Sequence, residues 1–365
     1  MSRPTRTPRL LALVALLGLG MVALACSKDD SSSSSSSGDK ASTSSTAKAS
    51  AEPVTVRLGY FPNITHGPAL VGIHEGLFAK RLGNNKLEVQ SYNAGPAAVE
   101  ALFGDAVDIT YIGPNPSINA FQKSQGDAVR IVSGSTSGGA SLVVAKDINS
   151  AKDLKGKTVS SPQLGNTQDV ALRTWLKDQG LQTDTSGGGD VSIKPQENAD
   201  TLTAFKTGAI AGAWVPEPWA TRLVQEGGGK VLVDEATLWP KGQFVTTNIL
   251  VSKKFLDAHP EAVKAVLEGH LDALDAIKAD PAKAKADANA EIEKATQKKL
   301  PDAVIDAAWQ KLAFTYDPLA TTLAKSASNA KAVGLLQSDD VKGIYDLDQL
   351  NALLKERDEK PVKGL

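Results

Sequence analysis

Apolar and polar residues alternate along the first part of the globular chain in short segments that predict strands and helices in turn. Residues 54–58 alternate with the period of a half-buried strand, and residues 69–78 place apolar side chains at helical spacing. The small-residue run 133–139 predicts a loop. The further strands expected in this part are 87–92, 107–111, 129–132 and 140–144, and the further helices are 97–103 and one that ends at 121. This succession indicates an α/β domain with a largely parallel sheet.

A second series of the same kind begins near residue 149. Residues 260–279 then carry apolar side chains on one helical face, and the chain from 280 to its end predicts helices that pack on the first domain. The strands expected here are 157–161, 191–194, 209–214, 231–233 and 244–251, with a helix at 200–208. The chain is therefore expected to form two α/β units and a helical extension.

The stretch 156–176 reads as strand, loop and helix, with Asn166 at the position of the helix N-cap. A helix N-terminus presents unpaired backbone N–H groups and about half a positive charge, so it binds small anions without Lys or Arg. Gln163, Asn166, Thr167 and Gln168 would surround such a site with neutral hydrogen-bonding groups. The alternative is a plain capped helix, in which Asp169 reaches back as the partner of Asn166.

Each strand of the first unit ends in a loop rich in Gly, Pro, Asn, Ser or Thr. In open α/β sheets, ligands bind beyond the carboxyl ends of the strands, so these loops should converge on one rim. The residues expected there are Asn63, His66, Gly95, Gly113, Asn115 and the run 135–139. Any one of these loops alone could be an ordinary turn, and His66 could be a structural histidine.

The segment Trp214-Val215-Pro216-Glu217-Pro218-Trp219 follows a predicted strand and forms a stiff loop with large flat side chains. A tryptophan ring at a pocket edge would contact the apolar part of a small ligand. Packing in the core is the competing interpretation, because tryptophan is usually mostly buried.

Composition removes several classes of function. Three of the 40 basic residues lie in the first 25 positions, so 37 remain against 41 acidic residues, and this weak acidity argues against a nucleic-acid partner. Cys26 is the single cysteine, so the chain can form neither an internal disulfide nor a cysteine zinc site. With only four histidines, a histidine-rich metal site is not expected either. We expect no cofactor and no metal.

The N-terminus has the order of a secretory signal: a basic start, an apolar run at 10–25 and small residues before Cys26. It resembles a bacterial lipoprotein signal, in which the cysteine carries the lipid, although Leu24 lies one position later than the usual leucine. A plain signal peptide is the alternative. Residues 26–53 are rich in Ser, Thr, Ala and Lys and cannot bury a core, so they predict a disordered tether.

Five segments taken in order resemble the sulfonate/nitrate/taurine-binding proteins of ABC importers. They are GYFPNITHGPALVG, NAGPAAVEALFGDAVDITYIGPNP, SGSTSGGASLVV, GNTQDVALRTWL and WVPEPW. The resemblance covers about residues 54–260. It implies a type II periplasmic-binding fold, with one lobe at 54–144 plus 246–365, a second at 148–242, and the ligand between them. Closure would be a hinge motion.

The same resemblance implies a set of ligand-binding residues without Arg or Lys, which suits a sulfonate held by N–H and hydroxyl groups. The set is Asn63, His66, Gly95, Pro96, Gly113, Asn115, Ser137, Gly138, Gly139, Asn166, Thr167, Gln168, Trp214 and Glu217. Glu217 could instead meet an amino group such as that of taurine.

We therefore expect an exported, lipid-anchored, monomeric solute receptor that captures an aliphatic sulfonate or taurine and works with ABC permease and ATPase subunits. The alternatives within the fold are a nitrate-binding and a thiamin-precursor pyrimidine-binding protein. An enzyme that makes the thiamin pyrimidine would need a cysteine-rich metal stretch, which one cysteine cannot supply. An adhesion or structural lipoprotein would not explain the converging loops.

Overall fold

The computed structural model describes residues 52–365, which form one compact unit. The predicted signal peptide at 1–25, Cys26 and nearly all of the predicted tether lie outside the described residues. Within the described part of the chain, no helix is long and apolar enough to cross a membrane.

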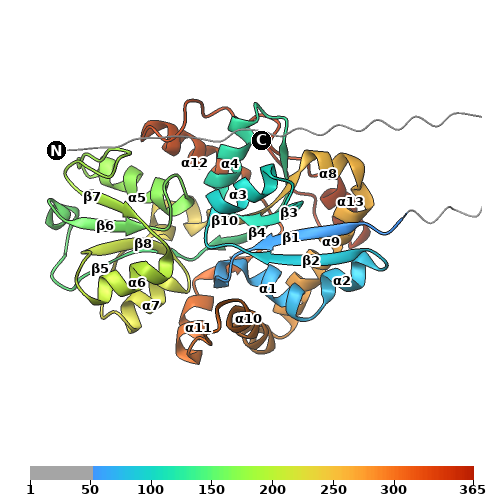
Figure 1. The fold of residues 1–365 in the computed structure, drawn as a ribbon, viewed down its shortest axis with the longest axis horizontal. Coiled ribbons are helices and arrows are strands. Elements are labelled where there is room, and N and C mark those ends of the chain that lie inside the picture. The colour runs from blue at the N-terminus through green and yellow to red at the C-terminus, as the bar shows by residue number, and fades with distance from the viewer. Residues whose placement is uncertain (1–51) are drawn as a thin grey trace, which may run out of the picture. The chain divides into compact units, whose positions relative to one another are not determined.

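Two sheets organise this unit (Figure 1). The first has the order β11-β4-β10-β3-β1-β2, and the second has the order β7-β6-β8-β5-β9. The strands of the first sheet are β1 Thr55–Tyr60, β2 Lys86–Ser91, β3 Ile109–Ile112, β4 Val129–Gly138, β10 Val245–Ser252 and β11 Leu312–Phe314. Those of the second are β5 Ala140–Val144, β6 Thr158–Ser161, β7 Ser192–Pro195, β8 Gly212–Pro216 and β9 Lys230–Asp234. We call each sheet with its helices a lobe.

Helices cover both faces of each sheet, so each lobe is a three-layer α/β sandwich (Figure 1). The helices of the first lobe are α1 Gly67–His74, α2 Leu77–Leu82, α3 Gly95–Phe103, α4 Pro114–Lys123, α8 Lys253–Ala258, α9 Pro260–Ala279, α10 Pro281–Thr296, α11 Asp302–Trp309, α12 Ala320–Ala332 and α13 Asp348–Glu356. Those of the second lobe are α5 Thr167–Asp178, α6 Asn198–Lys206 and α7 Trp219–Gln225. Short 3₁₀ turns occur at Ile64–His66, Ala151–Leu154, Glu235–Leu238 and Pro240–Gly242.

The sheets are mixed rather than largely parallel. In the first, β1 pairs in parallel with β2 and β3, whereas β10 runs antiparallel to both β3 and β4. In the second, β6 pairs in parallel with β7 and β8, whereas β5 runs antiparallel to β8 and β9. The antiparallel strands are those next to the crossings: β4 leads directly into β5, and β10 follows the return from the second lobe. Parallel pairing is confined to the βαβ units.

Three expectations about elements are corrected by this arrangement. The predicted loop 133–139 is mostly strand, because β4 continues to Gly138 between β10 and β11, and ladder hydrogen bonds outweigh the low strand propensity of Gly and Ser. The predicted helix 69–78 is two helices, since Gly76 takes a left-handed conformation between α1 and α2. The tail after residue 280 also contains β11 and a non-helical stretch at 333–347, so it is not helical throughout.

The strand at 140–144, which we expected in the first lobe, belongs to the second sheet. It pairs with β8 along its whole length and with β9 on its other side. The crossing between the sheets therefore lies at Gly138 and Gly139, a few residues earlier than the expected boundary at 144. Strand propensity alone could not assign β5, because its partners lie some 70 to 90 residues further along the chain.

Candidate ligand-binding site

A small cavity lies where the loops of the two lobes meet. Its volume is about 20 Å³, which is on the order of the space that one or two water molecules need. The first lobe lines it with Phe61, Asn63, Thr65, His66, Asn93, Ala94, Gly113, Thr246 and Thr247. The second lobe lines it with Pro162, Asn166, Thr167, Gln168, Asn198 and Pro216. The cavity is thus built from strand ends of both sheets, and it is large enough for one small chemical group.

The N-terminal ends of five helices contribute to this wall. His66 is the N-cap of α1, Ala94 that of α3, Gly113 that of α4 and Asn166 that of α5, while Asn198 is the first residue of α6. Each terminus carries partial positive charge from its unpaired N–H groups. Their convergence gives the cavity a positive potential that favours an anion.

The wall contains no Asp, Glu, Lys or Arg, so the helix ends supply this potential without a formal charge. Two of its buried polar atoms, Thr167 Oγ1 and Asn198 Oδ1, have no hydrogen-bond partner among the described residues. Buried polar atoms are usually hydrogen-bonded, and leaving them unpaired costs about 1–3 kcal/mol each. These atoms therefore indicate that the cavity is suited to a polar ligand.

His66 is a neutral part of this wall. Its side chain is 2% exposed, and burial lowers its pKa to about 3. Nδ1 accepts a hydrogen bond from the Phe61 backbone N–H at 3.2 Å, and the two rings lie 4.4 Å apart. The neutral ring consequently carries its proton on Nε2, which gives the cavity wall an N–H donor. His66 is thus both a structural residue and a residue of the cavity.

Close approaches at two glycines allow the walls to meet. A Cβ on Gly113 would lie 2.3 Å from Thr167 Oγ1, across the junction of the two lobes. A Cβ on Gly95 would lie 2.1 Å from Pro116 Cγ, so glycine lets the first turns of α3 and α4 come together. Both distances are too short for a side chain, which gives these glycines a steric role in shaping the site.

The buried carboxylate of Asp169 fixes the loop that contains Asn166. Asp169 accepts hydrogen bonds from Ser161 Oγ at 2.8 Å, from the Gly165 N–H at 2.9 Å and from Arg173 Nε at 3.0 Å. Asn166 Oδ1 accepts from the Thr167 N–H at 2.8 Å. Asp169 therefore binds the backbone N–H of Gly165 and not that of the N-cap residue Asn166, as a capping box would require. This charge pair fixes the loop while keeping both charges out of the cavity wall.

Six predicted residues line the cavity and eight do not. Those brought together are Asn63, His66, Gly113, Asn166, Thr167 and Gln168. Gly95 and Pro96 form the first turn of α3, next to the lining residue Ala94. Asn115 lies inside the first lobe, where its Nδ2 donates to the Ser326 carbonyl at 3.2 Å and links α4 to α12.

The predicted run Ser137, Gly138 and Gly139 forms the crossing between the lobes. Ser137 Oγ accepts from the Phe244 N–H at 3.2 Å, and the Gly138 carbonyl accepts from Thr246 Oγ1 at 2.6 Å. The Gly139 carbonyl accepts from the Glu217 N–H at 2.8 Å. The first two contacts join the two crossing segments to one another, and the third joins the first crossing to the end of β8. The predicted run does not line the cavity, but its Gly138 carbonyl binds the hydroxyl of the lining residue Thr246.

Trp214 lies in the core of the second lobe rather than at the cavity. Its ring is fully buried against Trp175 at a centroid distance of 6.2 Å, and its Nε1 donates to Glu235 Oε2 at 2.7 Å. Burial raises the pKa of Glu235 to about 7. Of the two interpretations of this tryptophan, the geometry therefore favours packing.

Glu217 is also fully buried and does not line the cavity. Its Oε2 accepts from the Thr221 N–H at 3.0 Å, and its Oε1 lies 3.4 Å from Lys311 Nζ of the first lobe. Burial raises its pKa, and Lys311 opposes that shift. Its carboxylate thus pairs with a lysine across the junction of the lobes.

Several lining residues were not singled out from the sequence. Most are neighbours of predicted ones in the same loops, as Thr65 is of His66 and Ala94 is of Gly95. Thr246 and Thr247 lie on the buried strand β10, and polar residues in a fully buried strand were the available signal. Asn198 opens α6, where the same helix-terminus argument used for Asn166 could have identified it.

Within residues 52–365, no three His, Cys, Asp or Glu side chains come together in a way that could hold a metal ion.

Comparison with known proteins gives consistent results. The model of the NMT1-like family matches residues 49–292. The taurine-binding periplasmic protein of Escherichia coli is 29% identical over 231 residues, which are 63% of this chain and 69% of that protein.

Two solved structures share the fold. The alkanesulfonate-binding protein SsuA from Xanthomonas axonopodis pv. citri, bound to MOPS, has a TM-score of 0.65 at 20% identity and covers 79% of this chain and 96% of its own. The periplasmic nitrate-binding protein NrtA from Synechocystis has a TM-score of 0.68 at 18% identity and covers 84% of this chain and 89% of its own. These similarities confirm the two-lobed periplasmic-binding-protein fold that the sequence motifs implied.

Proposed function

The chain belongs to the NMT1-like family, and from this premise we propose that it is the extracytoplasmic substrate-binding protein of an ABC importer. In this role it captures a small anionic solute, carries out no chemistry and delivers the solute to permease and ATPase subunits. Similarity to a taurine-binding periplasmic protein and to alkanesulfonate- and nitrate-binding folds supports this class of function. A lipid on Cys26 would hold the monomeric protein at the outer face of the membrane.

The observation that carries the proposal is the convergence of five helix N-termini on a small cavity whose wall contains no charged side chain. Such a wall stabilises negative charge through N–H and hydroxyl groups. No carboxylate is available in it to reject an anion or to pair with a cation. An aliphatic sulfonate or taurine, bound by its sulfonate group, is the ligand that we propose.

Two other ligands remain candidates. Nitrate is smaller than a sulfonate and would use the same donors. A thiamin-precursor pyrimidine has less support, because a flat ring binds best between aromatic side chains. Phe61 and His66 are the only aromatic rings of the wall, and they already pack on each other.

A thermal-shift screen of the purified protein tests the proposal. The panel contains taurine, short alkanesulfonates, sulfate, nitrate, bicarbonate and thiamin-precursor pyrimidines. A ligand at 100 times its dissociation constant adds about 2.7 kcal/mol to the free energy of unfolding, and this should raise the melting temperature by a few degrees. We expect sulfonates to give this shift. A shift with pyrimidines alone would replace the ligand, and no shift with any compound would contradict the binding function.

The helix-terminus site is tested by changing Asn166 and Thr167 to Ala together. Sulfonate affinity should fall at least tenfold, or about 1.4 kcal/mol, because one cap and one unpaired hydroxyl of the wall are lost. Asp302→Ala is the matched control, since it alters the first turn of α11, which does not line the cavity. Unchanged affinity in the double variant, with an intact fold, would reject this assignment.

A further inference from the structure

The chain returns from the second lobe to the first through residues 235–244, which we call the return segment. It contains two 3₁₀ turns, and only the residues at its two ends, Glu235 and Phe244, are buried. Trp239, in the middle, is half-buried, and its ring stacks on Phe244 at a centroid distance of 5.6 Å and an angle of 13°. Trp239 is therefore the side chain that anchors the middle of this segment.

The Glu235 carboxylate binds two tryptophans. Its Oε2 accepts from Trp214 Nε1 at 2.7 Å, and its Oε1 accepts from Trp239 Nε1 at 3.4 Å. Trp214 belongs to the core of the second lobe, so the carboxylate links the return segment to that core. The bond to Trp239 is the longer and hence the weaker of the two.

No cation balances the charge of this carboxylate. Within residues 52–365, no Lys, Arg or His nitrogen lies within 4.0 Å of either oxygen. Burial is the main cause that raises the pKa of Glu235 to about 7; the indole hydrogen bonds oppose the shift, and the Asp234 carboxylate adds to it. The other charged side chains around it are Lys177 and Asp178 of α5, Lys325 of α12, Lys230 of β9 and Lys241. Neighbouring strands β5 and β8 carry none.

Protonation changes how many tryptophans this group can bind. A carboxylate accepts both indole N–H bonds, whereas a protonated carboxyl group carries a hydrogen on one oxygen. An indole N–H is a donor only, so neither tryptophan can accept that hydrogen. The neutral group therefore keeps the stronger bond to Trp214 and loses the weaker one to Trp239. A groove of about 620 Å³ between α5 and α12, which Trp239 lines, gives the released ring space to move.

We propose that Glu235 is a proton-sensitive link between the core of the second lobe and the return segment. Its charged form holds Trp239, and its neutral form releases it. Phe244 leads into β10, and Thr246 of β10 lines the cavity, so release loosens the connection about which the lobes close. The protein should therefore hold its ligand more tightly above neutral pH than below it. The link stands apart from the proposed function, and only its effect on affinity rests on that function.

Proton–nitrogen NMR spectra of the purified protein between pH 5.5 and 8.5 test the link, because each of the five tryptophans gives one indole N–H signal. Single Trp→Phe variants assign these signals. The signals of Trp214 and Trp239 should shift with a common midpoint near pH 7, and that of Trp239 should shift further because its bond breaks. Glu235→Gln, which is neutral at every pH, should abolish both shifts. Glu226→Gln is the matched control in the same lobe and should keep them, since Arg222 lowers the pKa of Glu226.

Calorimetry with methanesulfonate at pH 8 and pH 6 tests the effect on binding. Affinity should fall at least threefold at the lower pH, and the pKa of His66, about 3, keeps that residue of the wall neutral at both. Trp239→Phe keeps a ring on Phe244 but has no N–H for Glu235, so it should remove this fall. Trp309→Phe, on half-buried Trp309 of α11, is the matched control and should retain the fall. The Trp214 signal should still titrate in Trp239→Phe, which tests the carboxyl group without replacing it.

Each outcome bears on one of three statements. Signals of Trp214 and Trp239 that stay fixed over this pH range, or that still titrate in Glu235→Gln, overturn the link. Equal methanesulfonate affinity at both pH values, or a fall that persists in Trp239→Phe, overturns its effect on binding and leaves the link in place. Binding of no sulfonate at either pH overturns the proposed ligand, while the NMR result still decides the link.

Discussion

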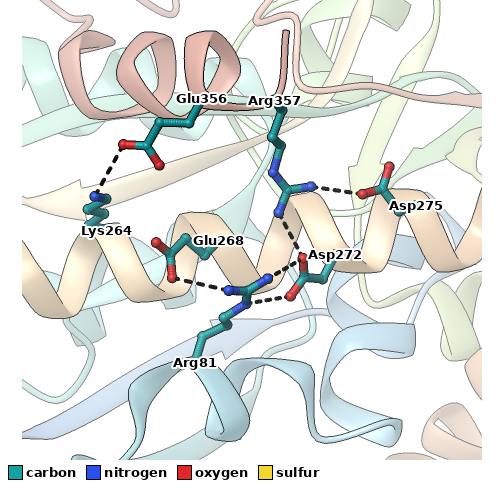
Figure 2. Close-up of polar contacts among 7 residues, drawn as sticks. All are labelled: Arg81, Lys264, Glu268, Asp272, Asp275, Glu356 and Arg357. Carbon is teal, nitrogen blue, oxygen red and sulfur yellow. Dashed lines mark hydrogen bonds and ion pairs between the residues drawn. The ribbon is translucent and has the colours of Figure 1, made fainter. Parts of the chain in front are cut away.

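Two polar regions of the molecule, the cavity between the lobes and an ion-pair network on the first lobe, use polar side chains in different ways. The network links α2, α9 and α13 through Arg81, Lys264, Glu268, Asp272, Asp275, Glu356 and Arg357 (Figure 2). Asp272 is its centre: its carboxylate lies 2.6 Å from Arg81 Nε and 2.7 Å from Arg357 Nη2. Every charge in the network has an opposite charge beside it. Among residues 52–365, no charged side chain lines the cavity, and two of its polar atoms have no hydrogen-bond partner.

The difference separates groups that stabilise the fold from groups that are available to a ligand. In the network, each charged side chain has a partner of opposite charge, and these pairs hold three helices together. In the cavity, helix ends and unpaired hydroxyl and amide groups keep their capacity free. The paired charges of the network thus stabilise the fold, whereas the unpaired neutral groups of the cavity wall are available to a ligand. Variants in the cavity should therefore change affinity, and variants in the network should change stability.

The largest effect is expected from low pH. Protonation of His66 would put a charge in the cavity wall, so a residue of the cavity would then change stability as well as binding. Its pKa in the fold is about 3, against an ordinary value near 6.5, so below 6.5 the unfolded chain binds a proton that the folded chain does not. Stability should therefore fall as the pH is lowered from 7.5 to 5.0, by about 2 kcal/mol for this group. His66→Gln should remove this part of the loss in urea unfolding measured at both pH values.

The same experiment contains its own control. His270, whose pKa burial also lowers to about 3, and Glu235, whose raised pKa acts in the opposite direction, are present in both proteins. They contribute equally to each, so the difference between the two pH profiles isolates His66. Identical profiles would contradict a buried neutral imidazole at position 66.

A smaller expected effect concerns how closely the lobes approach. Gly113→Ala places a Cβ 2.3 Å from Thr167 Oγ1, so the lobes should no longer close around a ligand without a shift. Sulfonate affinity by calorimetry should fall at least tenfold, about 1.4 kcal/mol. Gly104→Ala, at the C-terminal end of α3, is the control. Full affinity in Gly113→Ala would show that this approach is not needed for binding.

The smallest effect is expected in the network. Asp272→Ala leaves two arginines without their shared carboxylate, and it should lower the free energy of unfolding by about 1 kcal/mol, the scale of partly exposed ion pairs. Sulfonate affinity should remain within twofold. Asp275→Ala, which removes a single and more exposed partner of Arg357, should have a smaller effect on stability. A loss of affinity in Asp272→Ala would remove the distinction between the two regions.

Predictions from the sequence were most accurate where the information is local. Asn166 was expected to cap a helix after a short strand, and it is the N-cap of α5, with its neighbours Thr167 and Gln168 in the cavity wall. Asn63, His66 and Gly113 follow strand ends and reach the same wall. Strand ends and caps depend on a few adjacent residues, and parallel strands bring their carboxyl ends to one edge.

Predictions failed where the outcome depends on distant partners. Trp214 and Pro216 are two residues apart on β8, yet the tryptophan faces the core and the proline lines the cavity. Residues two apart point to the same face of a strand, so the two differ in their position along β8: Pro216 is its last residue, whereas Trp214 lies further inside the lobe, against Trp175 and Glu235. Asn115 was placed at the rim, but its hydrogen bond to Ser326, 211 positions away, turns it into the first lobe.

The sequence by itself therefore determined the succession of strands and helices, the exclusion of an internal disulfide and of a cysteine zinc site, and the polar loops at the strand ends. The tertiary structure decided which residue of each loop faces the cavity, that β5 joins the second sheet, and that Thr246 and Thr247 complete the wall. The physical reason is the distance along the sequence over which each interaction acts. Hydrophobic period, caps and turns act over a few residues, whereas the cavity is made by contacts between residues such as Gly113 and Thr167, which only folding brings together.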